Sequence, residues 1–89
     1  DPQKLSMRLT VNGETRQSGS TRDMIFSVAE LVSYISRFMS LQSGDVILTG
    51  TPAGVGLGQK PPVYLKPGDV VTASIECLGE QTHRVVASP

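Results

Sequence analysis

The residues best suited to chemistry in this sequence lie in one short segment, Thr49-Gly50-Thr51-Pro52. Thr49 and Thr51 offer hydroxyl groups, and Gly50 between them either lets a ligand approach the backbone closely or adopts a φ angle that other residues avoid. Hydroxyl groups and exposed backbone amides can bind a carboxylate without a positively charged side chain. The segment is therefore a candidate site for a carboxylate or another anion. The alternative is a β-bulge followed by a flexible connection.

The loop predicted from Thr49 to Tyr64 also matches two nucleotide-binding motifs in part. The Walker pattern GxxxxGK[ST] fails at Gln59, where glycine is required, and at Pro61, where the magnesium-binding hydroxyl belongs. The dinucleotide pattern GxGxxG also fails at Gln59. Both motifs need a helix directly afterwards to meet the phosphate, and the two consecutive prolines prevent one. The sequence therefore disfavours a nucleotide site.

The remaining polar residues give no catalytic or metal-binding pattern. His83 is the only histidine, and no residue nearby in the sequence would orient it as a general base. Cys77 is predicted on the apolar face of a strand, where we expect a small buried side chain. The acidic residues are scattered without a Glu-x-Glu pair, so we expect no metal ligand in this chain. Gln17, at the end of a predicted hairpin, either faces a pocket or is solvated.

Composition limits the classes of protein to consider. Eighty-nine residues make one domain at most, and with 38% apolar residues and no Trp the supply for an independent core is thin. Eight basic residues balance eight acidic ones without a block of either sign, so we expect no nucleic-acid partner. No apolar run approaches the roughly 18 residues of a membrane span. A single cysteine excludes an internal disulfide and fits a reducing compartment, so we expect a cytoplasmic location.

Two β-hairpins are predicted from alternating apolar and polar residues. Residues 7–11 alternate and are followed by Asn12-Gly13, a strong hairpin signal because both residues accept positive φ. Residues 71–77 alternate again, Gly79-Glu80 is expected to turn the chain, and residues 81–87 are expected to form the return strand. The strands dominate the pattern, which predicts an α+β fold, mostly β, with one helix.

The helix and one further strand are predicted between these hairpins. Ser27 and Glu30 have the spacing of a capping box, and the apolar residues that follow recur at helical spacing over about residues 28–39. The apolar residues 24–26 are expected in the core. Residues 45–48 form a nearly continuous apolar run, which predicts a strand buried on both faces.

A family resemblance is carried by two stretches, VNGETRQSGSTRDMIFSVAELVSYISRFMSLQSGDVILTGTPAGVG and KPPVYLKPGDVV. Residues 1–86 resemble the C-terminal part of the fumarylacetoacetate hydrolase family. The second stretch is more similar to the branch of 2,4-diketo-3-deoxy sugar acid hydrolases, acylpyruvate hydrolases and ureidoglycolate lyase-like proteins. The resemblance implies that residues 1–89 are a C-terminal portion of a catalytic domain with a mixed β-roll or barrel fold. The absence of an initial Met also favours a fragment, and family members commonly form dimers.

The activity implied by this resemblance is metal-dependent hydrolysis of a carbon–carbon bond in a 2,4-diketo acid. Other members isomerise, hydrate, decarboxylate or otherwise cleave related 2-oxo acids. Magnesium or manganese is implied, but its ligands lie upstream of the matching region. At the matching positions, Thr51 and Gly50 are expected to face the substrate carboxylate, with Thr49 and Gln17 as further candidates. We therefore expect a substrate-binding wall that is inactive without the N-terminal remainder; the alternative is a non-catalytic β-rich module.

Overall fold

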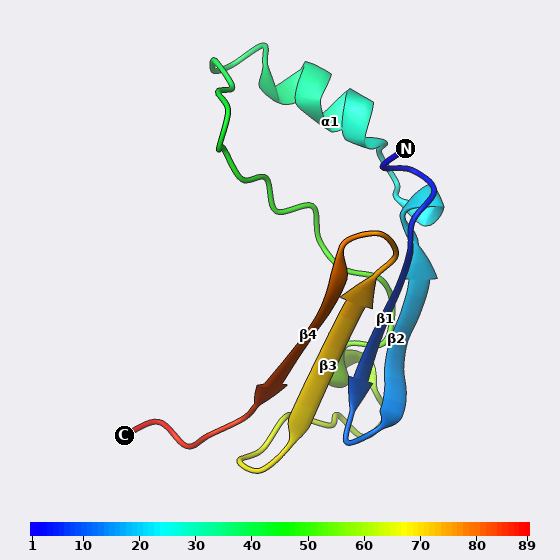
Figure 1. Ribbon diagram of the computed structural model, residues 1–89, viewed down its shortest axis with the longest axis vertical. Coiled ribbons are helices and arrows are strands. Elements are labelled where there is room, and N and C mark those ends of the chain that lie inside the picture. The colour runs from blue at the N-terminus through cyan, green and yellow to red at the C-terminus, as the bar shows by residue number, and fades with distance from the viewer.

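The computed structural model describes residues 1–89 as an open four-stranded antiparallel sheet, one α-helix and a long loop (Figure 1). The strands lie in the order β2-β1-β3-β4. The elements are β1 (Ser6–Val11), β2 (Glu14–Ser20), η1 (Thr21–Asp23), α1 (Val28–Ile35), η2 (Gly56–Gly58), β3 (Val70–Ile75) and β4 (Gly79–Arg84). The predicted α+β, mostly β class is confirmed. The sheet is not closed into a roll or barrel, because β2 and β4 have no further strand of this chain to pair with.

The first hairpin turns at Asn12-Gly13, as predicted, and the asparagine also joins the two hairpins. Both turn residues have positive φ, 52° and 81°. The Asn12 side-chain amide donates to Asp69 at 2.9 Å and accepts from the backbone N–H of Val70 at 2.9 Å. Asp69 is only 7% exposed, and its carboxylate also accepts from the Lys66 N–H at 3.0 Å. The hydrogen bond from Asn12, followed by that from Lys66, holds the pKa of the Asp69 carboxyl below its ordinary value.

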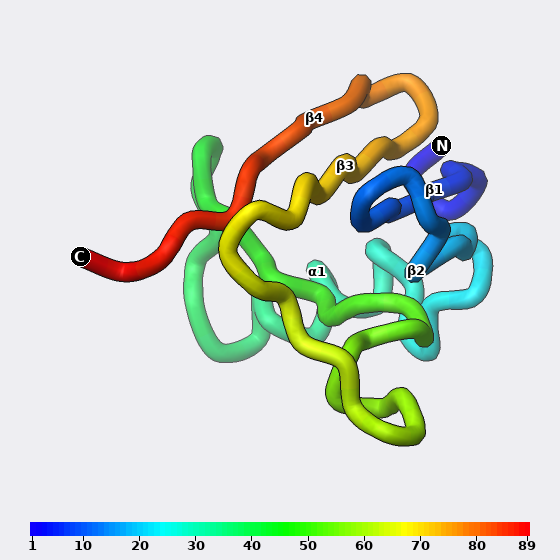
Figure 2. The backbone as a smooth tube through the Cα atoms, turned by 90° about the horizontal axis from the view of Figure 1, so that it is seen from below, coloured from blue at the N-terminus to red at the C-terminus, as the bar shows by residue number.

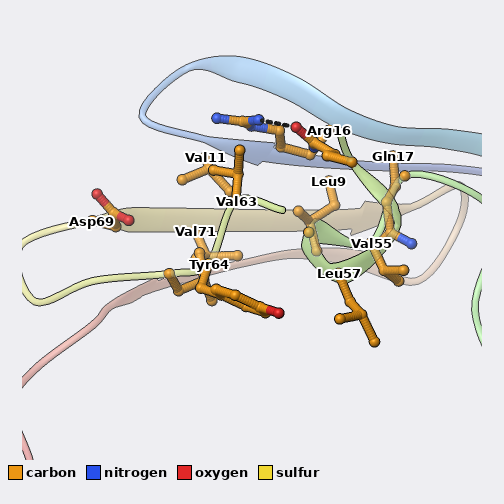
Figure 3. A pocket seen from close by; sticks show the side chains of 14 residues that line it. Leu9, Val11, Arg16, Gln17, Val55, Leu57, Val63, Tyr64, Asp69 and Val71 are labelled. Atoms are coloured by element: carbon orange, nitrogen blue, oxygen red, sulfur yellow. Dashed lines mark hydrogen bonds between the residues drawn. The ribbon is translucent and has the colours of Figure 1, made fainter. Parts of the chain in front are cut away.

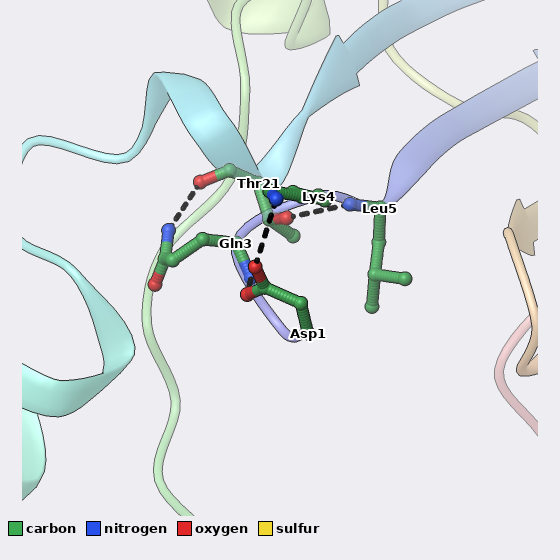
Figure 4. Close-up of polar contacts among 5 residues, drawn as sticks. All are labelled: Asp1, Gln3, Lys4, Leu5 and Thr21. Carbon is green, nitrogen blue, oxygen red and sulfur yellow. Dashed lines mark hydrogen bonds and ion pairs between the residues drawn. The ribbon is translucent and has the colours of Figure 1, made fainter.

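The N-terminal segment is hydrogen-bonded to Thr21 of η1, directly after β2 (Figure 4), and to the first residue of the helix. The Gln3 side-chain amide donates to the carbonyl of Thr21 at 2.7 Å, and the Thr21 hydroxyl accepts from the Leu5 N–H at 3.0 Å. The Gln3 carbonyl oxygen accepts from the N–H of Val28, the first residue of α1. Residue 3 thus satisfies one of the backbone donors that every helix start leaves without a partner.

The predicted capping box is confirmed, but the helix ends at Ile35 and not near residue 39. The Ser27 hydroxyl accepts from the Glu30 N–H, and the Glu30 carboxylate accepts from the Ser27 N–H, which lowers the pKa of Glu30. At the other end, the Ser36 hydroxyl donates to the carbonyl of Val32 at 2.6 Å. Side-chain competition of this kind for a backbone carbonyl weakens a helix. None of the helices has the length and apolar character that crossing a membrane requires.

The burial predicted for residues 24–26 and for residues 45–48 is wrong for this chain. Within residues 24–26, Ile25 is 91% exposed and Phe26 is 60% exposed, although a core position was expected. Residues 45–48 form no strand, and Leu48 is 93% exposed. The reason is the same in both places: the segment before α1, α1 itself and the connection after it project away from the sheet (Figure 1), so no other part of the chain covers Ile25, Phe26 or Leu48.

The second hairpin turns three residues earlier than predicted. β3 ends at Ile75, the chain turns over residues 76–78, and Gly79 already belongs to β4. Cys77 therefore lies in the turn with φ 65° and an exposed side chain, and the prediction that it is buried is wrong. The return strand ends at Arg84, short of the predicted residue 87.

Candidate functional site

The predicted loop after residue 48 is present and lies against β2. It has no regular structure apart from the short turn η2, and Figure 2 shows it on one side of the curved sheet. Gly54 has φ 111°, and a Cβ atom on it would collide with the backbone carbonyl oxygen of Arg16. A Cβ on Gly56 would collide with the carbonyl oxygen of Val63 in the same way. Glycine at these two positions therefore allows the loop to approach β2 and to fold onto itself.

The structure brings together two of the four residues that the sequence predicted for the site. The Gln17 side-chain nitrogen donates to the Thr51 hydroxyl at 2.7 Å and to the carbonyl of Pro52 at 2.7 Å. Pro52 also packs on β2, where a Cβ atom on Gly19 would lie 3.2 Å from the Pro52 Cβ. The strand therefore fixes the loop immediately after Gly50, through one side chain and one close backbone approach.

Thr49 and Gly50 lie beside this anchored point but form no hydrogen bond within the chain. Gly50 has φ 94°, so the prediction of a backbone conformation that other residues avoid is confirmed. Nothing lies within 4 Å of the position that a Gly50 Cβ would occupy, so close approach is not the reason for glycine within this chain. Thr49, Gly50 and Thr51 are all exposed, which leaves their amides and hydroxyls available to a ligand.

A cavity of about 420 Å³ lies between the loop and the sheet (Figure 3). Its walls are mainly apolar, with strand residues on one side and loop residues on the other: Leu9, Val11, Val71, Val55, Leu57 and Val63. The loop is also tied across the cavity by the Arg16 guanidinium, which donates to the Gln59 side chain at 3.2 Å. The exposed carboxylate of Glu14 lies 3.7 Å from the same guanidinium. Gln17 lines the cavity and is bonded to Thr51, so the candidate anion site borders this apolar space.

The charged groups of the chain do not form a metal centre. No three His, Cys, Asp or Glu side chains lie close enough to hold a metal ion. Asp69, the one buried acid, already accepts hydrogen bonds from Asn12 and from the Lys66 backbone. His83 is exposed on β4 and its ring lies 3.3 Å from the Gln81 side chain, with no carboxylate to orient it. The groups present in this chain therefore do not fit a metal site.

Sequence reasoning missed two of the contacts that hold the site. The role of Gly54 against Arg16 and the bond between Arg16 and Gln59 each join residues about forty positions apart, so no local pattern reveals them. The signal available was the excess of glycine in the loop itself, since a glycine inside a loop often marks a close backbone approach.

Comparison with known proteins settles the family. The family model described as fumarylacetoacetate (FAA) hydrolase C-terminal matches residues 1–86. The chain belongs to the fumarylacetoacetate hydrolase family. A curated family relative, 2,4-didehydro-3-deoxy-L-rhamnonate hydrolase of Sphingomonas sp. (strain SKA58), is 54% identical over 86 residues. Those residues cover 96% of this chain and 30% of the relative, so the chain spans about a third of the length of the curated relatives it matches.

Solved structures of the family share the fold of this chain. Fumarylacetoacetate hydrolase from Exiguobacterium antarcticum is 52% identical, with a TM-score of 0.94 over 99% of this chain and 32% of that chain. Maleylpyruvate hydrolase from Sphingobium sp. SYK-6 is 41% identical, with a TM-score of 0.83 over 97% of this chain and 30% of its own. The 2-hydroxyhepta-2,4-diene-1,7-dioate isomerase from Mycobacterium marinum is 45% identical, with a TM-score of 0.81 over 97% of this chain and 31% of the isomerase chain.

Proposed function

We propose that this chain supplies the substrate-carboxylate-binding wall of an enzyme that hydrolyses a carbon–carbon bond in 2,4-diketo acids of the acylpyruvate type. The observation that carries the proposal is the exposed Thr51 hydroxyl, presented beside Gly50 and held by Gln17 of β2. Two relatives are named as hydrolases of 2,4-didehydro-3-deoxy-L-rhamnonate and of maleylpyruvate. Both of those substrates are acids, which supports a carboxylate as the ligand of the corner.

The Thr49-Gly50-Thr51 corner has the groups that such binding needs. A carboxylate accepts several hydrogen bonds, and those from neutral hydroxyls and backbone amides become charge-assisted when it binds. Arg16, the nearest cation on β2, is already bonded to Gln59 and lies beside Glu14. We therefore assign the recognition of the carboxylate to neutral donors, which orient the acid end of the substrate relative to the reacting bond.

The metal of the proposed enzyme belongs to another part of the protein. The family is generally metal-dependent, and we infer magnesium or manganese as the ion. The acidic residues of this chain do not converge on one point, so we place the ligands in the N-terminal remainder. This division gives the present chain a binding role without a catalytic residue. It also makes the isolated 89 residues inactive in our proposal.

An isomerase is the second candidate, because the relative from Mycobacterium marinum is named for isomerisation of a dioate. The same corner would serve either reaction, since both substrates present a carboxylate. Assembly as a homodimer and a cytoplasmic location complete the proposal. Light scattering of the full-length protein tests the first, and cell fractionation tests the second.

The proposed activity is tested with full-length protein, magnesium and acetylpyruvate, by following the loss of diketo absorbance. We expect hydrolysis by the full-length protein and none by residues 1–89. Thr51→Val should raise KM about 10-fold with little change in kcat, because a hydrogen bond to the carboxylate contributes similarly to substrate and transition state. The matched control is Thr82→Val, which removes an exposed hydroxyl on β4.

Two results would count against the proposal. Unchanged KM and kcat in Thr51→Val would remove Thr51 from the site. Absence of hydrolysis by the full-length protein, together with turnover of a hydroxydiene dioate, would favour the isomerase.

A further inference from the structure

The two hydrogen bonds of Gln17 determine which way its side-chain amide is turned. Its terminal atom lies 2.7 Å from both the Thr51 hydroxyl oxygen and the Pro52 carbonyl oxygen. A carbonyl oxygen can only accept, so the atom facing Pro52 must be the NH2 nitrogen and not the amide oxygen. The nitrogen carries two protons, and each is directed to one of these two acceptors.

This orientation also determines the role of the Thr51 hydroxyl. Because the NH2 group can only donate, the Thr51 oxygen must accept from Gln17. A hydroxyl has one proton and two lone pairs, so the Thr51 proton stays free to be donated elsewhere. Thr51 is exposed and its hydroxyl has no other hydrogen bond in the chain. The hydroxyl is therefore left as a donor, which is the role that a carboxylate ligand requires.

The surroundings keep this geometry in place. Gln17 is paired with Leu9 in the β1–β2 ladder, next to the register shift between Leu9 and Thr10, so its backbone is held by the sheet. Pro52 packs against Gly19, and Gly54 lies directly on the carbonyl of Arg16. These contacts hold the loop at the residues directly after Thr51, at positions of β2 on either side of Gln17, so Thr51 cannot move away from Gln17 without disturbing them.

We propose that Gln17 is a positioning residue that sets the Thr51 hydroxyl as a hydrogen-bond donor to the substrate carboxylate, without touching the substrate. Both amide protons of Gln17 are used within the chain, so it has none left for a ligand. The sequence placed Gln17 among the substrate contacts, and this inference replaces that role with one exerted through Thr51. This role of Gln17 rests on the proposed carboxylate-binding function. It adds the reason why the ligand of Thr51 must be a hydrogen-bond acceptor.

The test uses the full-length protein and two substitutions of similar size at Gln17. Gln17→Met removes the donors and should raise KM for acetylpyruvate about 10-fold with kcat nearly unchanged. Gln17→Glu should raise KM more, about 100-fold, because a carboxylate accepts the Thr51 proton and repels the acid end of the substrate. Gln81→Glu, on the exposed strand β4, is the matched control and should leave KM unchanged.

A double-mutant cycle separates positioning from general structural support. If Gln17 acts through Thr51, adding Gln17→Met to Thr51→Val should change KM by less than about 2-fold beyond Thr51→Val alone. Three results would overturn the inference: KM increases that multiply in the double variant, a fall in kcat without a change in KM, or an unchanged KM in Gln17→Glu. The proposed function would still stand if Thr51→Val alone raises KM. If the wild type shows no turnover, the dissociation constant of pyruvate replaces KM in the same cycle. If the wild type shows neither turnover nor pyruvate binding, both this inference and the proposed function are overturned.

Discussion

The chain on the two sides of Gly50 differs sharply in how it is held. After the glycine, residues 51–54 are fixed to β2 by the Gln17 amide and by close packing at Gly19 and Gly54. Before it, residues 45–48 have no strand partner, and Val46 and Leu48 are 84% and 93% exposed. Both segments are rich in apolar or small residues, so composition does not explain the difference. The contacts available within the chain explain it: β2 supplies a complementary surface to one segment and nothing faces the other.

The largest expected effect comes from a substitution that detaches residues 51–54 from β2. Gly54→Ala introduces a Cβ against the Arg16 carbonyl at a residue with φ 111°, so the loop must leave β2. We expect the full-length protein to lose about 3 kcal/mol of stability and at least about 100-fold in kcat/KM. Denaturant unfolding and steady-state kinetics measure the two effects.

The matched control for that substitution is Gly79→Ala. Gly79 also has positive φ, 99°, but nothing lies within 4 Å of its Cβ position. Gly79→Ala should lower the free energy of unfolding by about 1–2 kcal/mol, through conformational strain alone, and leave KM unchanged. Equal effects from the two alanines would contradict the packing of the loop on β2.

An intermediate effect concerns the hydrogen bonds of Asn12, which link the first hairpin to the start of the second. Asn12→Gly keeps the positive φ of the turn but removes the amide that lowers the pKa of Asp69. A lowered folded-state pKa stabilises the fold above the ordinary value of 3.8, and this contribution is lost as the pH falls through the lowered pKa. The wild type should therefore exceed Asn12→Gly in stability at pH 7.

The stability difference between these two proteins should narrow as the pH falls below 3.8. Denaturant midpoints of both proteins at a series of pH values measure it. A difference that stays constant down to the acid limit of folding would mean that the Asp69 charge takes no part in the link.

The smallest expected effect lies on the unanchored side. Ser27→Ala removes the side-chain acceptor of the capping box and should destabilise the protein by about 1 kcal/mol. Because α1 projects away from the sheet, KM and kcat should stay within about 2-fold of the wild type. Melting temperature and kinetics together check this, and a KM change as large as that of Thr51→Val would show that the helix positions the corner after all.

The sequence predicted those features that depend on neighbouring residues. Asn12-Gly13 specified the first turn, Ser27 and Glu30 specified the helix start, and the irregular loop followed from the lack of a periodic pattern over residues 49–64. The predicted helix end is too late because the apolar pattern continues beyond Ile35, where the backbone changes to three-residue bonds such as that from Arg37 to Tyr34.

The features that failed depend on contacts across the chain. Cys77 and the segment 45–48 were expected to be buried from their apolar patterns, but an apolar pattern records only a capacity for burial. The site was foreseen as a set of residue types, and Thr51 and Gln17 do meet. The sequence does not reveal their relation, since the direction of this hydrogen bond across 34 positions follows from the second bond that Gln17 donates to the Pro52 carbonyl.

The central claim is that the Thr51 corner binds a carboxylate, and pyruvate is the smallest probe with the acid end of the proposed substrate. Isothermal titration of the full-length protein with pyruvate in the presence of magnesium, in wild type and Thr51→Val, measures this directly. The proposal expects the dissociation constant to rise about 10-fold in the variant, the loss of one charge-assisted hydrogen bond. Equal dissociation constants in the two proteins would contradict the claim.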